Sequence, residues 1–227
     1  MSTGTRDDLR NLLGNLTWPR TVAPRFDPDT APDDPVQLFV AWLGDAAAAG
    51  VPAPHAMTLA TVDAAGRPDA RTTLLEDVDE SAFWVSGSTT SPKGKQLSRV
   101  PVAALVFHWP LLGRQVRVRG TVRPADEVRT AEAFGRLSPE ARADALVDRQ
   151  SGPLHDEEWL SDALGDAGDL LRLEPGAVAP TWRLWGVDAG RLEFFQSAAD
   201  GHHLRLRYSR RVDEGNACGY VTEMLKP

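Results

Sequence analysis

The chain has 227 residues, 42% of them hydrophobic and 25% charged, a composition typical of a globular protein with a sizeable core. The formal net charge of −7 disfavours non-specific binding to nucleic acid or to anionic lipid. Cys218 is the single cysteine, which excludes an intramolecular disulfide and a four-cysteine zinc site. Because no apolar run approaches about 20 residues and no signal peptide is evident, we expect a cytosolic protein without a membrane partner.

Residues 1–33 are rich in Pro, Asp, Thr and Arg, and four prolines interrupt any regular element there. We expect a flexible N-terminal arm in this segment and one domain over residues 34–227. A helix is predicted to begin at its cap Asp34, with Pro35 in its first position, and to end near Gly50. Its apolar stripe comprises Phe39, Trp42, Leu43 and Ala46.

The segments that follow combine short apolar or alternating runs with turns, which is typical of strands. They cover residues 57–62, 70–76, 82–87, 101–109 and 114–123. Residues 125–173 have a helical pattern with breaks near 138–141 and 150–153, so two or three helices are predicted. Three more strands are expected in 182–197, 203–211 and 219–225, with turns at 188–190, 198–201 and 213–216. Seven or eight mostly sequential strands with a few helices favour an antiparallel barrel or coiled sheet.

Several catalytic motifs are absent from the sequence. A nucleotide-binding phosphate loop ends in Gly-Lys-Ser/Thr, whereas here Gln96 follows Gly94 and Lys95. The five histidines lack metal-ligand spacing, so no metal site is predicted. There is no Gly-x-Ser-x-Gly elbow, which leaves an esterase-type hydrolase unsupported.

One group of cations has the outline of a phosphate site. Ser91 and Pro92 can begin a short helix that carries Lys93 in its first turn, so N–H donors, a hydroxyl and an ammonium group meet there. Arg71 opens a strand and could add a planar guanidinium for phosphate oxygens. The alternative is that Ser91 only caps a surface helix and that Arg71 is a solvated strand residue.

From about residue 33 to residue 227, the chain resembles the pyridoxamine 5′-phosphate oxidase family in the order and spacing of its sequence blocks. The matching blocks are DPVQLFVAWL, a hairpin ending in RTTLLE, SPKGKQL, FHWPLLGRQVRVRG, RQS, RLEFFQ, HLRLRY and LKP. The resemblance implies a mainly β fold with inserted helices, an antiparallel, Greek-key-like, FMN-binding split β-barrel. It also implies a homodimer.

The resemblance further implies an FMN site in which Arg71 and Lys93 hold the phosphate. Gln150 and Ser151 are implied to reach the cofactor from the partner subunit, and Phe195 is implied to lie against the flavin. The full set of implied FMN-binding residues is Arg71, Thr72, Thr73, Leu74, Ser91, Lys93, Gln115, Gln150, Ser151, Phe195 and Arg207.

Departures from the family pattern bear on the substrate. Glu76 stands where the vitamin B6 oxidases have a lysine, and Pro92 replaces an arginine. The tyrosine, arginine and serine that grip the pyridoxal phosphate group align with Ala133, Leu137 and Ala141. An Arg-x-His that touches that substrate corresponds to the run His203, Leu204, Arg205. We therefore expect FMN binding to be retained and the B6 phosphate site to be lost.

This combination resembles the flavin oxidases of phenazine biosynthesis, which oxidise partly reduced tricyclic carboxylates with O2 as the electron acceptor. His203, Arg205 and Glu76 are the candidate substrate-positioning residues, and Glu76 could serve as a base. The structural alternatives are an exposed turn histidine at His203 and a surface strand residue at Glu76. Two rival functions stay open: a true pyridoxamine 5′-phosphate oxidase with a remodelled phosphate pocket, and a non-catalytic flavin- or haem-binding split-barrel module.

Overall fold

The structure is a computed structural model, and it describes residues 3–16, 23–80, 82–148, 150–152, 156–198, 200–213 and 216–227. The strands are β1 Ala56–Val62, β2 Pro68–Leu74, β3 Asp77–Val78, β4 Ala82–Ser88, β5 Val102–Trp109, β6 Arg114–Pro124, β7 Trp182–Asp188, β8 Arg191–Gln196, β9 Leu204–Asp213 and β10 Asn216–Met224. The α-helices are α1 Thr3–Asn15, α2 Pro35–Ala48, α3 Pro92–Arg99, α4 Glu127–Gly135, α5 Pro139–Val147 and α6 Glu157–Leu173. Short 3-10 turns cover Pro28–Thr30 and Pro110–Leu112.

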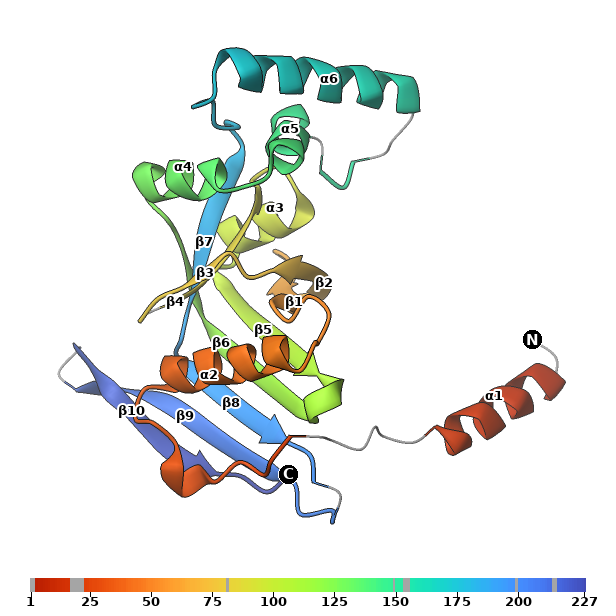
Figure 1. Cartoon of the computed structure of the whole chain (residues 1–227), viewed down its shortest axis with the longest axis vertical. Helices are drawn as coiled ribbons and strands as arrows, with labels where there is room; N and C mark the ends of the chain where they lie inside the picture. The colour runs from red at the N-terminus through yellow and green to blue at the C-terminus, as the bar shows by residue number, and fades with distance from the viewer. Residues whose placement is uncertain are drawn as a thin grey trace.

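All strand pairs in the described residues are antiparallel, and the strands follow the order β10-β9-β8-β6-β5-β1-β2 (Figure 1). A second path runs from β3 through β4 and β7 to the end of β6. Strand β6 therefore belongs to both parts: its first half pairs with β8, and Val122–Pro124 pairs with β7. This sharing curls the sheet into a half-barrel, as the sequence predicted.

The number of strands differs from the sequence prediction, because the described residues contain ten strands rather than seven or eight. The segment 182–197 was counted within three C-terminal strands, although a turn was predicted at residues 188–190. It forms β7 and β8 on either side of that turn, and the two strands pair with different parts of β6. The two-residue strand β3 has too little sequence to show a pattern.

Helix α2 packs its apolar stripe on the inside of the half-barrel. Asp34 caps it as predicted, accepting a hydrogen bond from the Val36 N–H at 2.9 Å. The ring centroids of Phe39 and of Phe107 in β5 lie 4.8 Å apart. Trp42 meets Phe194 of β8 edge-on, with 5.3 Å between the ring centroids. These fully or nearly fully buried rings join the helix to two strands and form the centre of the core.

The described N-terminal residues comprise a helix and a segment that contacts the rest of the domain. Residues 3–15 form helix α1, which precedes the prolines and lies apart from the sheet in Figure 1. Residues 23–33 are attached to the domain: the Gln196 side chain accepts from the Phe26 N–H at 2.7 Å and donates to the Pro24 carbonyl at 2.9 Å. The flexible arm and the division at residue 34 stay predictions, and residues 1, 2 and 17–22 lie outside the described residues.

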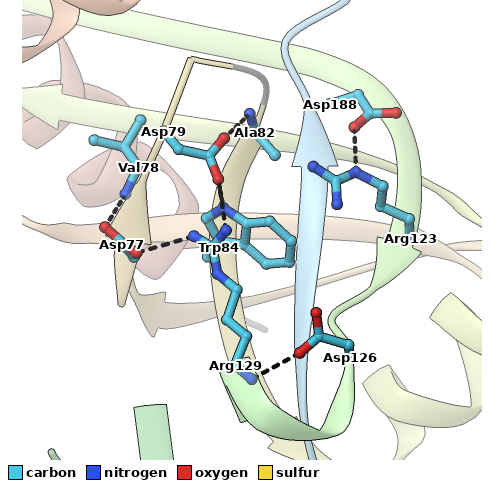
Figure 2. Close-up of polar contacts among 9 residues, drawn as sticks. All are labelled: Asp77, Val78, Asp79, Ala82, Trp84, Arg123, Asp126, Arg129 and Asp188. Carbon is cyan, nitrogen blue, oxygen red and sulfur yellow. Dashed lines mark hydrogen bonds and ion pairs between the residues drawn. The ribbon is translucent and has the colours of Figure 1, made fainter. Parts of the chain in front are cut away.

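The helical region 125–173 forms three helices, as predicted, and a polar cluster fixes the first of them to the sheet. Arg129 of α4 donates to Asp79 at 2.8 Å and to Asp77 at 3.0 Å, and Trp84 donates to Asp79 at 2.7 Å (Figure 2). The Arg129 guanidinium carbon also lies 3.8 Å from the centroid of the Trp84 ring, a cation–π contact. Helix α4 is thereby held against the β3–β4 hairpin, and the α4–α5 segment covers one end of β4.

No helix in the described part of the chain is long and apolar enough to cross a membrane. Among those same residues, no group of three or more His, Cys, Asp or Glu side chains is arranged to hold a metal ion.

Candidate functional site

Helix α3 begins at the predicted cap. The Ser91 hydroxyl accepts from the Gly94 N–H at 3.2 Å and donates to the Ser88 carbonyl at 2.7 Å. Ser91 is 1% exposed, so its hydroxyl is fully used by its own chain. The capping interpretation of Ser91 is supported, and the implied contact between this hydroxyl and a cofactor is not.

Lys93 extends from the first turn of α3 across strand β4 at Gly87. A Cβ at Gly87 would lie 2.2 Å from the Lys93 Cε and 2.7 Å from its Nζ, so a side chain there would force the end of the lysine to move from its present position. The half-buried ammonium makes no hydrogen bond or ion pair with the residues that the structure describes. Burial, followed by the positive charge of Arg71, lowers the pKa of Lys93, while the charge of Glu76 opposes the shift.

Arg71 lies near Lys93, but its guanidinium is not the free fork that the sequence suggested. Its Nη atoms donate to the Thr61 hydroxyl at 2.6 Å and to the Leu59 carbonyl and the Gln96 side chain, each at 3.1 Å. It also pairs with Asp69 at 2.5 Å. Arg71 therefore contributes positive charge to the surroundings of Lys93, whereas its hydrogen-bonding capacity is largely taken by its own chain.

A pocket of about 280 Å³ surrounds Lys93, and we call it the Lys93 pocket. It is lined by Thr73, Leu74, Glu76, Ser86, Gly87, Ser88, Lys93, Leu137, Ala141, Asp144, Ala145, Asp148, Gln150 and Trp182. Of the implied cofactor residues, the structure thus brings together Thr73, Leu74, Lys93 and Gln150. Thr72 is exposed and does not line this pocket.

Gln150 lies at the break in the helical region that the sequence predicted near residues 150–153, and Asp148 anchors the chain just before it. Asp148 accepts hydrogen bonds from the Ser88 hydroxyl at 2.7 Å and the Thr90 hydroxyl at 3.0 Å. Its φ of 57° is in the left-handed region, so the chain turns sharply there. Gln150 and Lys93 of one chain consequently line one pocket. The implied contact of Gln150 with the cofactor of a partner subunit stays a prediction. Ser151 is exposed and does not line it.

The helical wall of the Lys93 pocket is apolar where the family pattern has phosphate ligands. Leu137 and Ala141 line the pocket, and Ala133 is buried in the small core around Trp84 and Phe134. None of these three side chains can donate a hydrogen bond. The expected loss of the B6 phosphate grip therefore agrees with the positions that these residues occupy.

A second pocket, of about 310 Å³, is lined mainly by residues of β6, β8 and β9, and we call it the Arg205 pocket. It is lined by His108, Gly113, Arg114, Gln115, Arg117, Glu193, Phe195, Arg205 and the C-terminal Pro227. Gln115, Phe195 and Arg205 lie side by side across three strands, since Gln115 pairs with Phe195 and Phe195 pairs with Arg205.

Glu193, a residue that sequence patterns did not single out, holds Arg205. The Arg205 Nη2 lies 2.6 Å and its Nε 3.1 Å from the Glu193 Oε2, and Arg117 donates to the same oxygen at 3.3 Å. Burial favours a higher pKa for Glu193, but the hydrogen bonds and charge of Arg205, then the charges of Arg117 and Arg207, lower it below its usual value. Glu193 is thus a carboxylate that orients two arginines at the pocket.

Arg207 and His203 do not join the Arg205 pocket. Arg207 pairs with Glu223 of β10 at 2.6 Å and lines neither pocket, which argues against its implied contact with a cofactor. The His203 Nδ1 accepts from the Ala198 N–H at 3.1 Å, and its ring lies 5.7 Å from the Phe195 ring. His203 is exposed, as the alternative of a turn histidine predicts.

A family model described as pyridoxamine 5′-phosphate oxidase matches residues 43–165. The chain is 38% identical to the pyridoxine/pyridoxamine 5′-phosphate oxidase of Hyphomonas neptunium over 190 residues, which cover 81% of this chain and 84% of that protein. The protein of the same name from Caulobacter vibrioides is 36% identical over 86% of each chain.

Two solved structures have the same fold. PhzG from Burkholderia lata 383, in complex with tetrahydrophenazine-1-carboxylic acid, gives a TM-score of 0.81 at 26% identity, over 90% of this chain and 99% of that one. A pyridoxamine 5′-phosphate oxidase-related, FMN-binding protein from Nostoc punctiforme gives a TM-score of 0.68 at 20% identity, over 85% and 97% of the two chains. These likenesses confirm the split-barrel fold that the sequence resemblance implied.

Proposed function

Because the chain belongs to the pyridoxamine 5′-phosphate oxidase family, we propose that it is an FMN-dependent oxidase of a reduced heterocyclic substrate. The observation that carries this proposal is Lys93, a half-buried ammonium beside Arg71 with no partner among the described residues. An anion that joins a partly buried cation offsets part of the cost of its burial, and a phosphate dianion suits two adjacent cations. The residues present therefore fit the phosphate of FMN.

In this proposal, Lys93 and the charge of Arg71 hold the phosphate, while Thr73, Leu74 and Gln150 border the rest of the cofactor. Gln115, Phe195 and Arg205 supply an amide, an aromatic ring and a cation for the flavin end. When bound, FMN accepts a hydride from the substrate and passes the electrons to O2, which gives hydrogen peroxide. The residues of the chain would bind the cofactor, orient the substrate and supply positive charge.

We further propose that a second copy of the chain completes the site. The residues assigned to one cofactor divide between the Lys93 pocket and the Arg205 pocket, which share no lining residue. The first is lined mainly by residues of β2, β4 and α5, and the second mainly by residues of β6, β8 and β9 together with Pro227. In a two-fold dimer, the Lys93 pocket of one subunit can face the Arg205 pocket of the other.

For the substrate, we propose a dihydro- or hexahydro-phenazine carboxylate or a similar reduced tricycle. Support comes from the likeness to PhzG, whose structure contains tetrahydrophenazine-1-carboxylic acid, and from the apolar wall at Leu137 and Ala141. The second candidate is pyridoxine/pyridoxamine 5′-phosphate oxidation, which is favoured by the names of the relatives at 36–38% identity. The helical wall of the Lys93 pocket lacks hydrogen-bond donors for a substrate phosphate, which argues against this second candidate.

The test is to purify the protein with FMN and to measure O2 consumption and peroxide formation with tetrahydrophenazine-1-carboxylic acid and with pyridoxamine 5′-phosphate. We expect turnover with the first compound and at least about 100-fold lower kcat/KM with the second, because a phosphate that lacks its ligands loses several hydrogen bonds to charged groups. The reverse preference would establish the second candidate. A flavin that reoxidises in air without turnover of either compound would indicate a non-catalytic module.

A further inference from the structure

Glu76 follows strand β2 and presents a carboxylate to the Lys93 pocket. Its Oε1 accepts a hydrogen bond from the Ser86 hydroxyl at 2.6 Å, and its backbone N–H donates to the Trp84 carbonyl at 2.9 Å. The backbone bond and the serine together fix the position of the carboxylate. Its Oε2 has no hydrogen-bond partner within the described ranges, so one acceptor atom stays available in the pocket.

The other groups of the pocket are less suited to accept a proton. Lys93 is a cation that the proposed function assigns to the cofactor phosphate. Asp148 accepts hydrogen bonds from two hydroxyls, and Asp144 is exposed to solvent on α5. Glu76 is thus the acid side chain that is both oriented and available.

The remaining surface of the pocket favours a ring system. Leu74, Leu137, Ala145 and Trp182 contribute apolar area near Glu76, and Trp182 is buried with only 5% of its surface exposed. An uncharged ring can bury against these side chains without losing hydration of a charge. An N–H on that ring would find the Glu76 carboxylate as its acceptor.

We propose that Glu76 is a catalytic residue that accepts the proton of a ring N–H on a partly reduced nitrogen heterocycle, an inference that rests on the proposed oxidase function. The two-electron oxidation removes a hydride from a ring carbon, with flavin as the oxidant. The electron pair of the adjacent N–H bond becomes the second bond of a C=N group. The released proton goes to the Glu76 carboxylate, which returns it to solvent before the next turnover.

Binding of two matched, unreactive probes tests the contact without turnover. Acridone and xanthone are uncharged tricycles of the same shape that differ in an N–H and a ring oxygen. The wild-type holoenzyme is expected to bind acridone about 10-fold or more tightly than xanthone, since a hydrogen bond to a charged acceptor contributes about 1.5–3 kcal/mol. In Glu76→Gln the preference should fall to about threefold or less, because the acceptor is then neutral. Equal binding of the two probes by the wild type would overturn the proposal.

Kinetics with tetrahydrophenazine-1-carboxylic acid test the proton transfer. Glu76→Gln is expected to lower kcat about 100-fold with little change in KM, the usual contribution of a positioned base. We expect the wild-type kcat to decrease at acid pH, because the base must be unprotonated, and we expect this decrease to be absent in Glu76→Gln. Glu76→Asp should recover part of the activity. The control is Glu132→Gln, which removes an exposed carboxylate of α4 that lines neither pocket.

The outcomes separate the inference from the proposed function. If the wild type binds FMN and oxidises the tricycle while Glu76→Gln keeps kcat within threefold and the same pH profile, the role of Glu76 is wrong and the oxidase function stands. If the wild type retains no FMN or turns over no reduced heterocycle, the proposed function fails, and the inference fails with it.

Discussion

Lys93→Met is expected to weaken FMN binding by about 100-fold, because the phosphate loses a charge-assisted contact worth about 2–3 kcal/mol. Methionine keeps the length and the apolar contacts of the lysine stem along β4, so the change removes mainly the charge. The dissociation constant is measured from the quenching of flavin fluorescence, and retention is measured from the flavin absorbance after gel filtration.

The matched control is Lys95→Met on the same helix. Lys95 is exposed and lines neither pocket, so its removal should change the dissociation constant by less than about twofold, as for an isolated surface charge. Equal, small effects of the two substitutions would show that the phosphate does not bind at Lys93.

The lowered pKa of Lys93 gives the FMN affinity a defined pH dependence. The phosphate prefers the protonated amine, so the affinity should decrease as pH rises through the lowered pKa of Lys93. In the FMN-free protein the unfolded chain binds this proton more tightly than the folded chain does. The lysine therefore contributes a stability that increases with pH between its folded and unfolded pKa values, and Lys93→Met should lose both dependences.

Arg205→Ala is expected to weaken FMN binding by at least about 10-fold, because it removes one charge-assisted hydrogen bond. Arg207→Ala is expected to weaken it by less than about twofold, because it removes only a surface ion pair. Arg205 lines the pocket that contains Gln115 and Phe195, whereas Arg207 pairs with Glu223 outside it. We thus expect Arg205 to contact FMN, whereas the sequence resemblance implied that Arg207 contacts FMN and that Arg205 positions the substrate.

Thermal unfolding of both variants provides the control for folding, because Arg205→Ala leaves Glu193 with fewer partners. Arg205→Lys separates charge from geometry: a lysine keeps the charge but cannot reproduce the two-atom contact with Glu193. A loss of FMN in Arg207→Ala with full retention in Arg205→Ala would restore the original assignment.

Local sequence signals predicted the elements that carry the site. The cap at Asp34 and the stripe containing Phe39 and Trp42 place α2, and Ser91 with Pro92 places the start of α3 and hence Lys93. These features depend on neighbours within one or two helical turns, so a single sequence contains them.

The partners of several site residues depend on contacts between distant parts of the chain, and sequence patterns could not predict these contacts. Arg205 and Arg207 lie on the same face of β9 by alternation, and only the register with Phe195 distinguishes them. The hydrogen bonds that occupy Arg71 involve Gln96, 25 residues away, and the Asp148 anchor of the Gln150 loop joins Ser88 across 60 residues. No local pattern contains these partners. The lysine-to-glutamate departure at Glu76 was visible in the sequence, but its hydrogen bond with Ser86 was not.

Mixing Lys93→Met with Arg205→Ala tests most directly the claim that two copies of the chain build each cofactor site. The variants carry different tags, are refolded together and are compared with each variant refolded alone. In a mixed two-fold dimer one site holds both substitutions and the other holds neither, so a random mixture should regain about a quarter of the wild-type FMN sites and activity. If the mixture binds no more FMN than the two variants do separately, Lys93 and Arg205 serve a site within one chain, and the shared-site account is wrong.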